Sequence, residues 1–349
     1  MRIAIISPLM ESVPPKLYGG TERIVSYLTE ELVHQGHDVT LFASGDSVTC
    51  ADLRPITEQG LRLDPACRDP FAHYAIMLDQ VASVADEFDV LHFNIDYLHF
   101  PLARQRGLRT VTTLHGRLDL PDLLPLYRHF DDIPLVSISD AQRQPLPVAN
   151  WAATIYHGLP SKLYSLHRKP GDYLAFLGRI SPEKRPDRAI RIARRAGIPL
   201  KIAAKVEKGV DEVYFEECIR PLLAGPGVEF IGEIGEGEKN EFLGNALALL
   251  FPIDWPEPFG LVMIEAMACG TPVVAFPCGS VPEVIREGVN GYIAADEDEA
   301  VAAVEKCAGL DRQKCRADFE EHFSAERMTR DYVRVYGRLL ADSPSAIEA

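Results

Sequence analysis

The sequence predicts an α/β fold made of two doubly wound, Rossmann-like domains. Short apolar runs recur along the chain with amphipathic segments between them. Strands whose two faces are both covered by helices lose their polar alternation, so this pattern is typical of parallel sheets joined by helices. At 349 residues, the chain also exceeds the length of about 250–300 residues at which one hydrophobic core usually stops growing. We therefore expect two domains with a cleft between them.

The apolar runs give the order of the expected strands. In the first half, strands are expected at residues 3–6, 39–42, 90–93, 111–114, 135–138 and 154–156. In the second half, they are expected at residues 173–177, 200–203, 228–231, 247–251 and 273–276. Open α/β sheets bind ligands at the carboxyl ends of their strands, so functional residues are sought just after these runs.

The domain boundary is expected near residues 160–172, where a proline and a glycine lie among polar and basic residues. We place the first domain at residues 1–165 and the second at residues 166–325. Residues 326–341 carry apolar side chains close to helical spacing, which predicts a packed helix. This helix is expected to cross back onto the first domain.

Composition excludes several classes of function. The formal net charge of -15 disfavours nucleic-acid binding and a polybasic membrane anchor, both of which need clustered Lys and Arg. The seven cysteines are odd in number and form no Cys-x-x-Cys pair, so free thiols are expected rather than a zinc site or a disulfide set. The N-terminal apolar run is too short for a signal peptide, and no stretch approaches a membrane span. A cytoplasmic protein without an integral membrane segment is expected.

A glycine pair marks a candidate ligand loop in the first domain. Gly19 and Gly20 precede a helical pattern, and a helix that begins after glycines offers unpaired N–H groups to a phosphate. The alternative is a turn that ends in a Thr21 N-cap. The Gly-x-Gly-x-x-Gly fingerprint of dinucleotide-binding proteins is absent here.

Two cations follow the first strand of the second domain. Arg179 and Lys184 lie on the loop after residues 173–177, where they can neutralise a diphosphate. Arg can fork two oxygens, whereas Lys acts as a point charge. Solvation of both side chains at the surface is the alternative.

The sharpest feature lies around Glu257. Prolines follow both Trp255 and Glu257, which biases those two residues to extended conformations, and Pro258 is expected to open a helix. Glu257 is thereby presented rigidly beside a helix N-terminus. The amides around three first-turn residues can then hold phosphate or sugar oxygens: Phe259, Gly260 and Leu261.

Glu265 is expected about two turns into the same helix, among apolar neighbours. A carboxylate is costly in such a setting unless it is hydrogen-bonded. Carboxylates accept hydrogen bonds from pairs of hydroxyls, so the two glutamates fit a sugar and a ribose better than a bare phosphate. A buried Glu that caps a neighbouring backbone is the alternative.

His115 ends an expected strand at the carboxyl edge of the first domain, where it could hydrogen-bond a sugar hydroxyl or the acceptor. A satisfied structural histidine is the alternative. The other histidines show no His-Glu-x-x-His pattern, and the acidic residues 296–298 suit the start of a helix, so no metal site is expected.

Taken together, these residues resemble the retaining glycosyltransferases of family four, which have the two-domain GT-B fold. The resemblance covers nearly the whole chain, and the element from Glu257 to Glu265 is its most specific part. It rests on the Gly19-Gly20 loop, Leu114-His115-Gly116, Gly178-Arg179 to Lys184, Glu257-Pro258-Phe259-Gly260 to Glu265, and Gly279-Ser280-Val281-Pro282-Glu283.

The resemblance implies a role for each motif. The second domain binds the nucleotide and the first the acceptor; Glu265 holds the ribose, and Glu257 with the following amides holds the transferred sugar. Arg179 and Lys184 stabilise the diphosphate. On the first domain, Gly20 approaches the phosphate and His115 contacts the sugar. Attack on the same face of the sugar is implied, with the leaving phosphate accepting the proton and no divalent metal.

Two positions depart from the family pattern. Arg185 replaces the glycine common after the lysine, and His157 replaces an asparagine often seen before the glycine at 158. Both departures concern the local geometry of a loop more than the class of enzyme.

The expected donor is UDP-glucose, with GDP-mannose next, and no cofactor beyond this co-substrate is expected. Residues 14–22 and 253–257 resemble a bacterial subgroup that includes enzymes glucosylating tetrahydrobiopterin from UDP-glucose.

The acceptor is expected to be a small molecule or a hydroxyl of a glycan or lipid. Loops such as 52–70 and 117–128 contain no motif that identifies it, and the oligomeric state is open. Two alternatives share the fold: a non-hydrolysing nucleotide-sugar epimerase and a non-catalytic sugar-nucleotide sensor.

Overall fold

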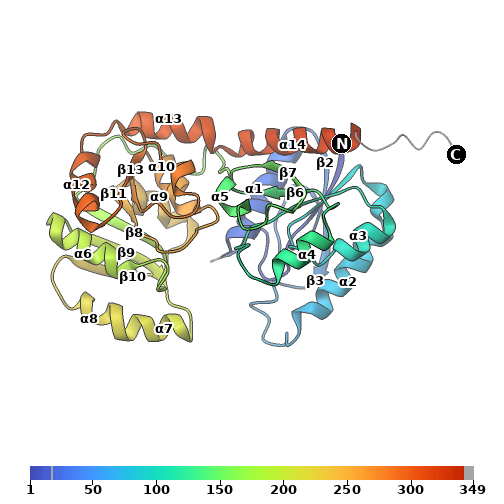
Figure 1. Ribbon diagram of the computed structural model, residues 1–349, viewed down its shortest axis with the longest axis horizontal. Helices are drawn as coiled ribbons and strands as arrows, with labels where there is room; N and C mark the ends of the chain where they lie inside the picture. Colours follow the sequence, from blue (N-terminus) through green and yellow to red (C-terminus); the bar gives the residue numbers. More distant parts are fainter. Residues whose placement is uncertain (17–18, 342–349) are drawn as a thin grey trace. The chain divides into compact units, whose positions relative to one another are not determined.

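The computed structural model describes residues 1–16 and 19–341. The chain divides into two compact units, and each is described by itself. Unit 1 consists of residues Met1–Pro160 together with the chain from Ala325 onward, and unit 2 of Ser161–Ser324. Figure 1 traces both units from blue to red along the sequence.

Unit 1 is built on a parallel sheet of seven strands in the order β3-β2-β1-β4-β5-β6-β7. The order reverses on either side of β1, which is the signature of a doubly wound sheet. Strands β1, β2 and β4 are almost wholly buried, so most of their residues are apolar. The strands are β1 (Arg2–Ile6), β2 (Asp38–Ser44), β3 (Asp52–Thr57), β4 (Val90–Phe93), β5 (Thr110–Thr113), β6 (Leu135–Ser137) and β7 (Trp151–Thr154).

Helices enclose this sheet. Helix α1 packs on β2 and also against α14, the last helix of the chain, which therefore belongs to unit 1. Two tyrosines of α14 reach polar groups under the helix: Tyr336 Oη lies 2.8 Å from His92 Nδ1, and Tyr332 Oη lies 2.9 Å from Thr113 Oγ1. The helices are α1 (Gly20–His34), α2 (Pro70–Ser83), α3 (Phe100–Arg106), α4 (Leu123–His129), α5 (Asp140–Arg143) and α14 (Ala325–Ala341), with a 3-10 turn at Ala85–Glu87.

Unit 2 is a parallel sheet of six strands in the order β10-β9-β8-β11-β12-β13. The order reverses around β8, so the carboxyl ends of β8 and β11 lie side by side at the point where ligands of such sheets bind. The strands are β8 (Tyr173–Arg179), β9 (Leu200–Lys205), β10 (Val228–Gly232), β11 (Ala246–Phe251), β12 (Val273–Ala275) and β13 (Gly291–Ile293).

The helices of unit 2 form two groups. Helices α6 and α12 pack on each other and on the sheet, whereas α10 packs with α9 and α13 (Figure 1). A buried arginine, Arg312 at the start of α13, donates to the carbonyl oxygens of Ala246 at 2.9 Å and Gly244 at 2.8 Å. The helices are α6 (Pro186–Ala196), α7 (Val210–Tyr214), α8 (Arg220–Leu223), α9 (Glu236–Gly244), α10 (Leu261–Ala268), α11 (Val281–Val284), α12 (Glu297–Cys307) and α13 (Arg312–His322), with a π-helical turn at Phe215–Ile219.

The fold predicted from the sequence, two Rossmann-like domains with parallel sheets, is confirmed. Three details of the prediction are wrong. The strand expected at residues 154–156 lies at Trp151–Thr154, and β3 and β13 were not foreseen. Both are edge strands: β3 is half-exposed and contains Pro55, and β13 has three residues. Part of the segment expected to be an acceptor loop, residues 52–70, is therefore sheet edge.

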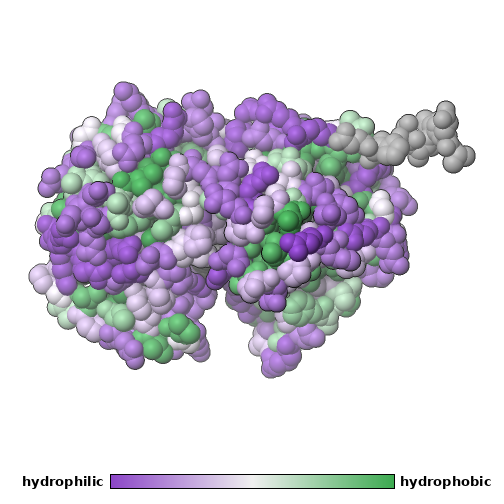
Figure 2. All heavy atoms as spheres, in the orientation of Figure 1, coloured by the Kyte–Doolittle hydropathy of each residue, from purple (hydrophilic) through white to green (hydrophobic). Residues whose placement is uncertain are grey.

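Polar side chains cover most of the face visible in Figure 2, and apolar side chains form smaller patches on it. None of the helices that the structure describes is long and apolar enough to cross a membrane. The seven cysteines lie within the described residues and are not joined by disulfides.

Candidate active site

The candidate site of unit 2 is assembled from segments that follow three strands. They are the loop between β8 and α6, the segment between β11 and α10, and the loop after β12. All three leave the sheet at its carboxyl edge, since the strands are parallel. A backbone hydrogen bond of 2.8 Å from Asp254 N–H to the Glu183 carbonyl ties the first two segments together.

The site centres on an ion pair between Lys184 and Glu257. The ammonium of Lys184 donates to Glu257 Oε2, and the indole Nε1–H of Trp255 donates to the same oxygen at 2.9 Å. The Lys184 ammonium also lies 5.1 Å from the centroid of the Trp255 ring, which favours a cation electrostatically. Both charged side chains are mostly buried, with 19% and 12% of their surface exposed. A lysine from one loop and a glutamate from the next are thus held at one point.

The backbone of Glu257 is supported by the loop after β12. Ser280 N–H donates to the Glu257 carbonyl at 3.0 Å, and the Ser280 hydroxyl donates to the Phe259 carbonyl at 2.6 Å. Gly279 has a φ of 58°, and a Cβ on it would lie 2.2 Å from the Glu257 carbonyl oxygen. Only glycine allows this close approach, which explains the Gly279-Ser280 pair of the motif.

Helix α10 begins later than the sequence indicates. Pro258 does not open it; the helix starts at Leu261, after Gly260 in the left-handed conformation at φ 82°. Phe259 is instead a core residue, 2% exposed. The first bond of the turn runs from Met263 N–H to the Gly260 carbonyl, so the amides of Leu261 and Val262 have no acceptor within the helix. The amides available for a ligand are therefore shifted towards Leu261.

Glu265 lies in the second turn of α10, with 3% of the residue exposed. It is not a cap for neighbouring backbone: Lys239 Nζ donates to Glu265 Oε1 at 2.8 Å and lies 3.3 Å from Glu236 Oε2. The Tyr164 hydroxyl donates to the other oxygen of Glu236. Glu265 is thus a charged partner in a mostly buried ion pair. Sequence reasoning missed Lys239, because only the i, i+3 spacing from Glu236 is visible along the chain.

Arg179, the last residue of β8, is surrounded by carboxylates. Its guanidinium pairs with Glu183, with Glu207 at 3.4 Å and with Asp211 at 3.2 Å. Burial raises the pKa of Asp211, and the charge of Arg179 only partly offsets this. Arg179 and Lys184 are thus both paired with carboxylates, and a diphosphate would have to compete with these carboxylates for Arg179.

The departure at position 185 has a clear structural consequence. Arg185 adopts the left-handed conformation, with φ 53° and ψ 51°, at the N-cap of α6. This conformation is sterically unfavourable for a residue with a Cβ atom, whereas glycine adopts it readily. Arg185 bonds Asp187 at 3.0 Å and Asp254 at 2.7 Å, so its side chain fastens the lysine loop to the segment before Glu257. These bonds hold a conformation that the family pattern assigns to glycine.

Two variants separate strain from pairing at this position. Arg185→Ala loses both ion pairs and keeps the strained φ, whereas Arg185→Gly loses the pairs and the strain. The glycine variant is therefore expected to be more stable than the alanine variant by about 1 kcal/mol. Urea unfolding of both variants measures the difference. An alanine variant at least as stable as the glycine variant would show that Arg185 is not strained.

Two further arginines of α6 face helix α12. Arg191 pairs with Asp187 at 2.9 Å and with Glu297 at 2.8 Å, and Arg195 pairs with Asp298. Burial alone would raise the pKa of Asp187, but hydrogen bonds from Arg185, Tyr214 and Arg191 hold it well below its usual range. Arg191 and Arg195 thus make a helix–helix contact, and the acidic start of α12 does more than complement its own helix dipole.

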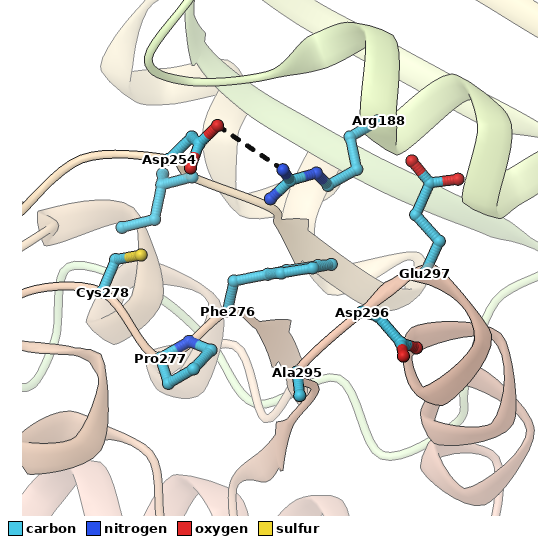
Figure 3. A pocket seen from close by; sticks show the side chains of 9 residues that line it. Arg188, Asp254, Phe276, Pro277, Cys278, Ala295, Asp296 and Glu297 are labelled. Atoms are coloured by element: carbon cyan, nitrogen blue, oxygen red, sulfur yellow. Dashed lines mark ion pairs between the residues drawn. The ribbon is translucent and has the colours of Figure 1, made fainter.

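A pocket of about 320 Å³ lies beside these loops at the carboxyl ends of β11, β12 and β13. Figure 3 shows Arg188 ion-paired with Asp254 close to the ring of Phe276. Its nine described lining residues include none of the site residues predicted from the sequence. Three carboxylates and a single arginine line it, so this pocket suits an anionic ligand poorly. The carboxylates are those of Asp254, Asp296 and Glu297.

The glycine pair of unit 1 starts α1 as expected, but without the Thr21 cap. Gly19 is the N-cap and Gly20 the first helical residue. A Cβ on Gly19 would lie 2.8 Å from the Pro15 side chain, so the loop packs tightly there. Burial raises the pKa of the Glu22 carboxyl, which accepts hydrogen bonds from its own backbone N–H and from that of Glu11. A phosphate at this helix start would meet a carboxylate that already uses one amide of the first turn.

His115 follows β5 in unit 1, and its Nε2 lies 2.9 Å from Asn94 Oδ1. Its ring stacks on that of His157 with centroids 5.3 Å apart and planes at 17°. Burial lowers the pKa of His115 to about 3, so the ring is neutral near pH 7. His157, the second departure from the family pattern, is thus a stacking partner of His115.

Comparison with known proteins supports this reading of the fold. Residues 165–322 match the family "Glycosyl transferases group 1", and residues 18–155 match "Glycosyltransferase Family 4". The two matches together take in most of the chain. This chain belongs to the glycosyltransferases. Their GT-B fold is matched as well: AviGT4, a glycosyltransferase involved in avilamycin A biosynthesis, superposes with a TM-score of 0.75 over 98% of this chain and 99% of its own, at 24% identity.

Curated relatives match this glycosyltransferase either over only part of its length or at low sequence identity. A D-inositol 3-phosphate glycosyltransferase of Actinosynnema mirum is 32% identical over 47% of this chain, and the match spans only 44% of that relative. An N-acetyl-alpha-D-glucosaminyl L-malate synthase of Bacillus anthracis is 24% identical over 93% of this chain and 95% of its own length.

Proposed function

We propose that this glycosyltransferase moves a hexose from a nucleoside diphosphate sugar to a hydroxyl group with retention of anomeric configuration. UDP-glucose is the donor we favour, with GDP-mannose next. The observation that carries the proposal is the joint placement of Lys184, Glu257 and the start of α10 at one sheet edge, with Glu265 one turn further along. The coarser assignment rests on the glycosyltransferase families that both halves of the chain match.

The arrangement supports a separate role for each residue, according to the part of the sugar nucleotide that it contacts. Lys184 and Arg179 stabilise the charge that develops on the departing diphosphate. Glu257, whose carboxylate is fixed by Lys184 and Trp255, accepts from hydroxyls of the hexose. The amides of Leu261 and Val262 donate to donor oxygens. Glu265 accepts from the ribose diol through the oxygen that Lys239 leaves open.

The transfer step needs no side chain as nucleophile in this proposal. The bond from the anomeric carbon to the phosphate oxygen breaks while the acceptor oxygen attacks the same face of the sugar. The proton of the acceptor hydroxyl passes to the departing phosphate oxygen, so the step balances without a further base. His115, neutral near pH 7, contacts a sugar hydroxyl rather than acting as an acid. We propose that no divalent metal takes part.

The acceptor is assigned only by its chemistry: a hydroxyl of a small molecule, a glycan or a lipid. The relatives named above are described as acting on inositol phosphate and malate, which are small polar acceptors. Unit 1 supplies the acceptor side in this proposal.

Slow hydrolysis of the donor by the full-length protein tests both the reaction and its stereochemistry. Proton NMR of UDP-glucose and GDP-mannose with excess EDTA is expected to show release of the α-anomer of the hexose first, together with the nucleoside diphosphate. Initial β-anomer would contradict retention, and loss of turnover in EDTA would contradict metal independence. A 2-epimeric sugar nucleotide would indicate an epimerase instead, and binding without any turnover would indicate a sensor.

A further inference from the structure

Asn94 follows β4 at the carboxyl edge of unit 1 and is 5% exposed. Its backbone N–H donates to the Ile6 carbonyl at 2.9 Å, and its side-chain Nδ2 donates to the same oxygen at 3.3 Å. The backbone bond already satisfies that carbonyl, so the side-chain bond is not needed for the strand. What the second bond does is orient the amide, because it turns Oδ1 towards His115.

We propose that Asn94 is a positioning residue that fixes the tautomer of His115. An amide oxygen can only accept a hydrogen bond, so the ring nitrogen 2.9 Å away must carry the proton. That nitrogen is Nε2. In a neutral imidazole the other nitrogen then has a lone pair and no proton. The inference rests on the proposed contact between His115 and the transferred sugar.

The surroundings keep the ring neutral, as the argument requires. His157 stacks on one face of His115. Burial lowers the pKa of His92 and of His157, so both of these rings are neutral near pH 7 as well. The positive charge of Arg327 further lowers the pKa of His157. Burial lowers the pKa of His115 to about 3. The tautomer, rather than the charge, is therefore what a neighbouring residue can set.

The tautomer of His115 decides whether Nδ1 accepts a hydrogen bond from a sugar hydroxyl or donates one to it. Nδ1 of His115 is out of contact with solvent and has no hydrogen-bond partner among the residues that the structure describes. With Nε2–H fixed by Asn94, this lone pair can accept from a sugar hydroxyl as the donor is bound. The opposite tautomer would point a lone pair at Asn94 Oδ1 and offer the hydroxyl a donor instead. Asn94 thus selects a hydroxyl that donates at this position.

The test reads the tautomer directly in the full-length protein. Long-range proton–nitrogen NMR of histidine-labelled protein distinguishes protonated from unprotonated ring nitrogens, and His115→Gln assigns the signals. The wild type is expected to show Nε2 protonated and Nδ1 not. Asn94→Leu is expected to give a mixture of tautomers and to lower kcat for donor hydrolysis about 10-fold with little change in KM.

Asn94→Asp provides the conservative control. Its carboxylate keeps an acceptor at the same place, so Nε2–H is expected to be retained, while the added negative charge raises the pKa of His115. The activity of Asn94→Asp near pH 8 should therefore be close to that of the wild type. Towards acid pH, its activity should fall more steeply than that of the wild type. A purely structural role for Asn94 would lower the melting temperature in both variants without moving the tautomer or the pH profile.

The outcomes separate this inference from the proposed function. Nδ1–H in the wild type, or unchanged Nε2–H in Asn94→Leu, would overturn the role of Asn94 even if hydrolysis proceeds with retention. Full activity in His115→Gln would overturn the proposed contact of His115 with the sugar, and with it the functional part of the inference. Nε2–H in the wild type with a mixture in Asn94→Leu supports it.

Discussion

Replacing Lys184 with methionine is expected to lower kcat/KM for the nucleotide sugar about 100- to 1000-fold. Methionine keeps the length of the side chain and removes the ammonium that pairs with Glu257 and faces Trp255. A preorganised donor aimed at developing transition-state charge is worth about 3–4 kcal/mol. The loss should appear mainly in kcat, because charge on the diphosphate grows as the glycosidic bond breaks.

Lys201→Met is the matched control for Lys184→Met. Lys201 makes a similar cation–aromatic contact, 4.5 Å from the Tyr173 ring, but lies on β9 and pairs with Glu229. Its kcat/KM should stay within about twofold of the wild type, as expected for a surface charge outside the site. Steady-state hydrolysis and transfer rates of both variants, with melting temperatures, make the comparison. Equal losses in the two variants would mean that Lys184 has no specific role.

Much of the fold could be predicted because buried strands are recognisable in the sequence as runs of apolar residues. β1 and β11 are buried along nearly their whole length and appear as apolar runs, and His92 is the single polar residue of buried β4. The edge strand β3 carries Pro55 and exposed polar residues, since one side of it needs no hydrogen-bond partner. A pattern based on hydrophobic runs cannot detect such a strand.

The site could be predicted only in its local parts. Glu257 and Lys184 were each marked by their loops, but their contact joins residues 73 positions apart and depends on the sheet order. Lys239 gave no signal, because its pairing with Glu265 needs α9 and α10 to lie together. The start of α10 was placed too early, because the proline at 258 outweighed the glycine whose φ of 82° sets the true boundary.

The pairing of Arg179 with its surrounding carboxylates could not be predicted from the sequence either. Glu183 is close along the chain, whereas Glu207 and Asp211 come from the segment after β9. Parallel pairing of β8 with β9 brings that segment to the same edge. Long-range charge pairs of this kind follow from topology, which local patterns do not specify.

Replacing Glu265 with glutamine is expected to weaken nucleotide binding at least about 100-fold, since charged hydrogen bonds to the ribose are worth about 1.5–3 kcal/mol each. The protein should also lose stability, by up to about 3 kcal/mol, because Lys239 keeps only Glu236 as its partner. Glu236→Gln is the control: it disturbs the same lysine and should leave nucleotide affinity within about threefold.

Calorimetric titration of the full-length protein tests the central claim most directly, that the carboxyl edge of unit 2 binds a sugar nucleotide. UDP, UDP-glucose and GDP-mannose are titrated in EDTA into the wild type, Glu265→Gln and Glu236→Gln, each checked for folding by its melting temperature. We predict saturable binding of at least one sugar nucleotide to the wild type and to Glu236→Gln, and its loss in folded Glu265→Gln. Absence of binding in the wild type, or equal affinity in Glu265→Gln, would contradict the account.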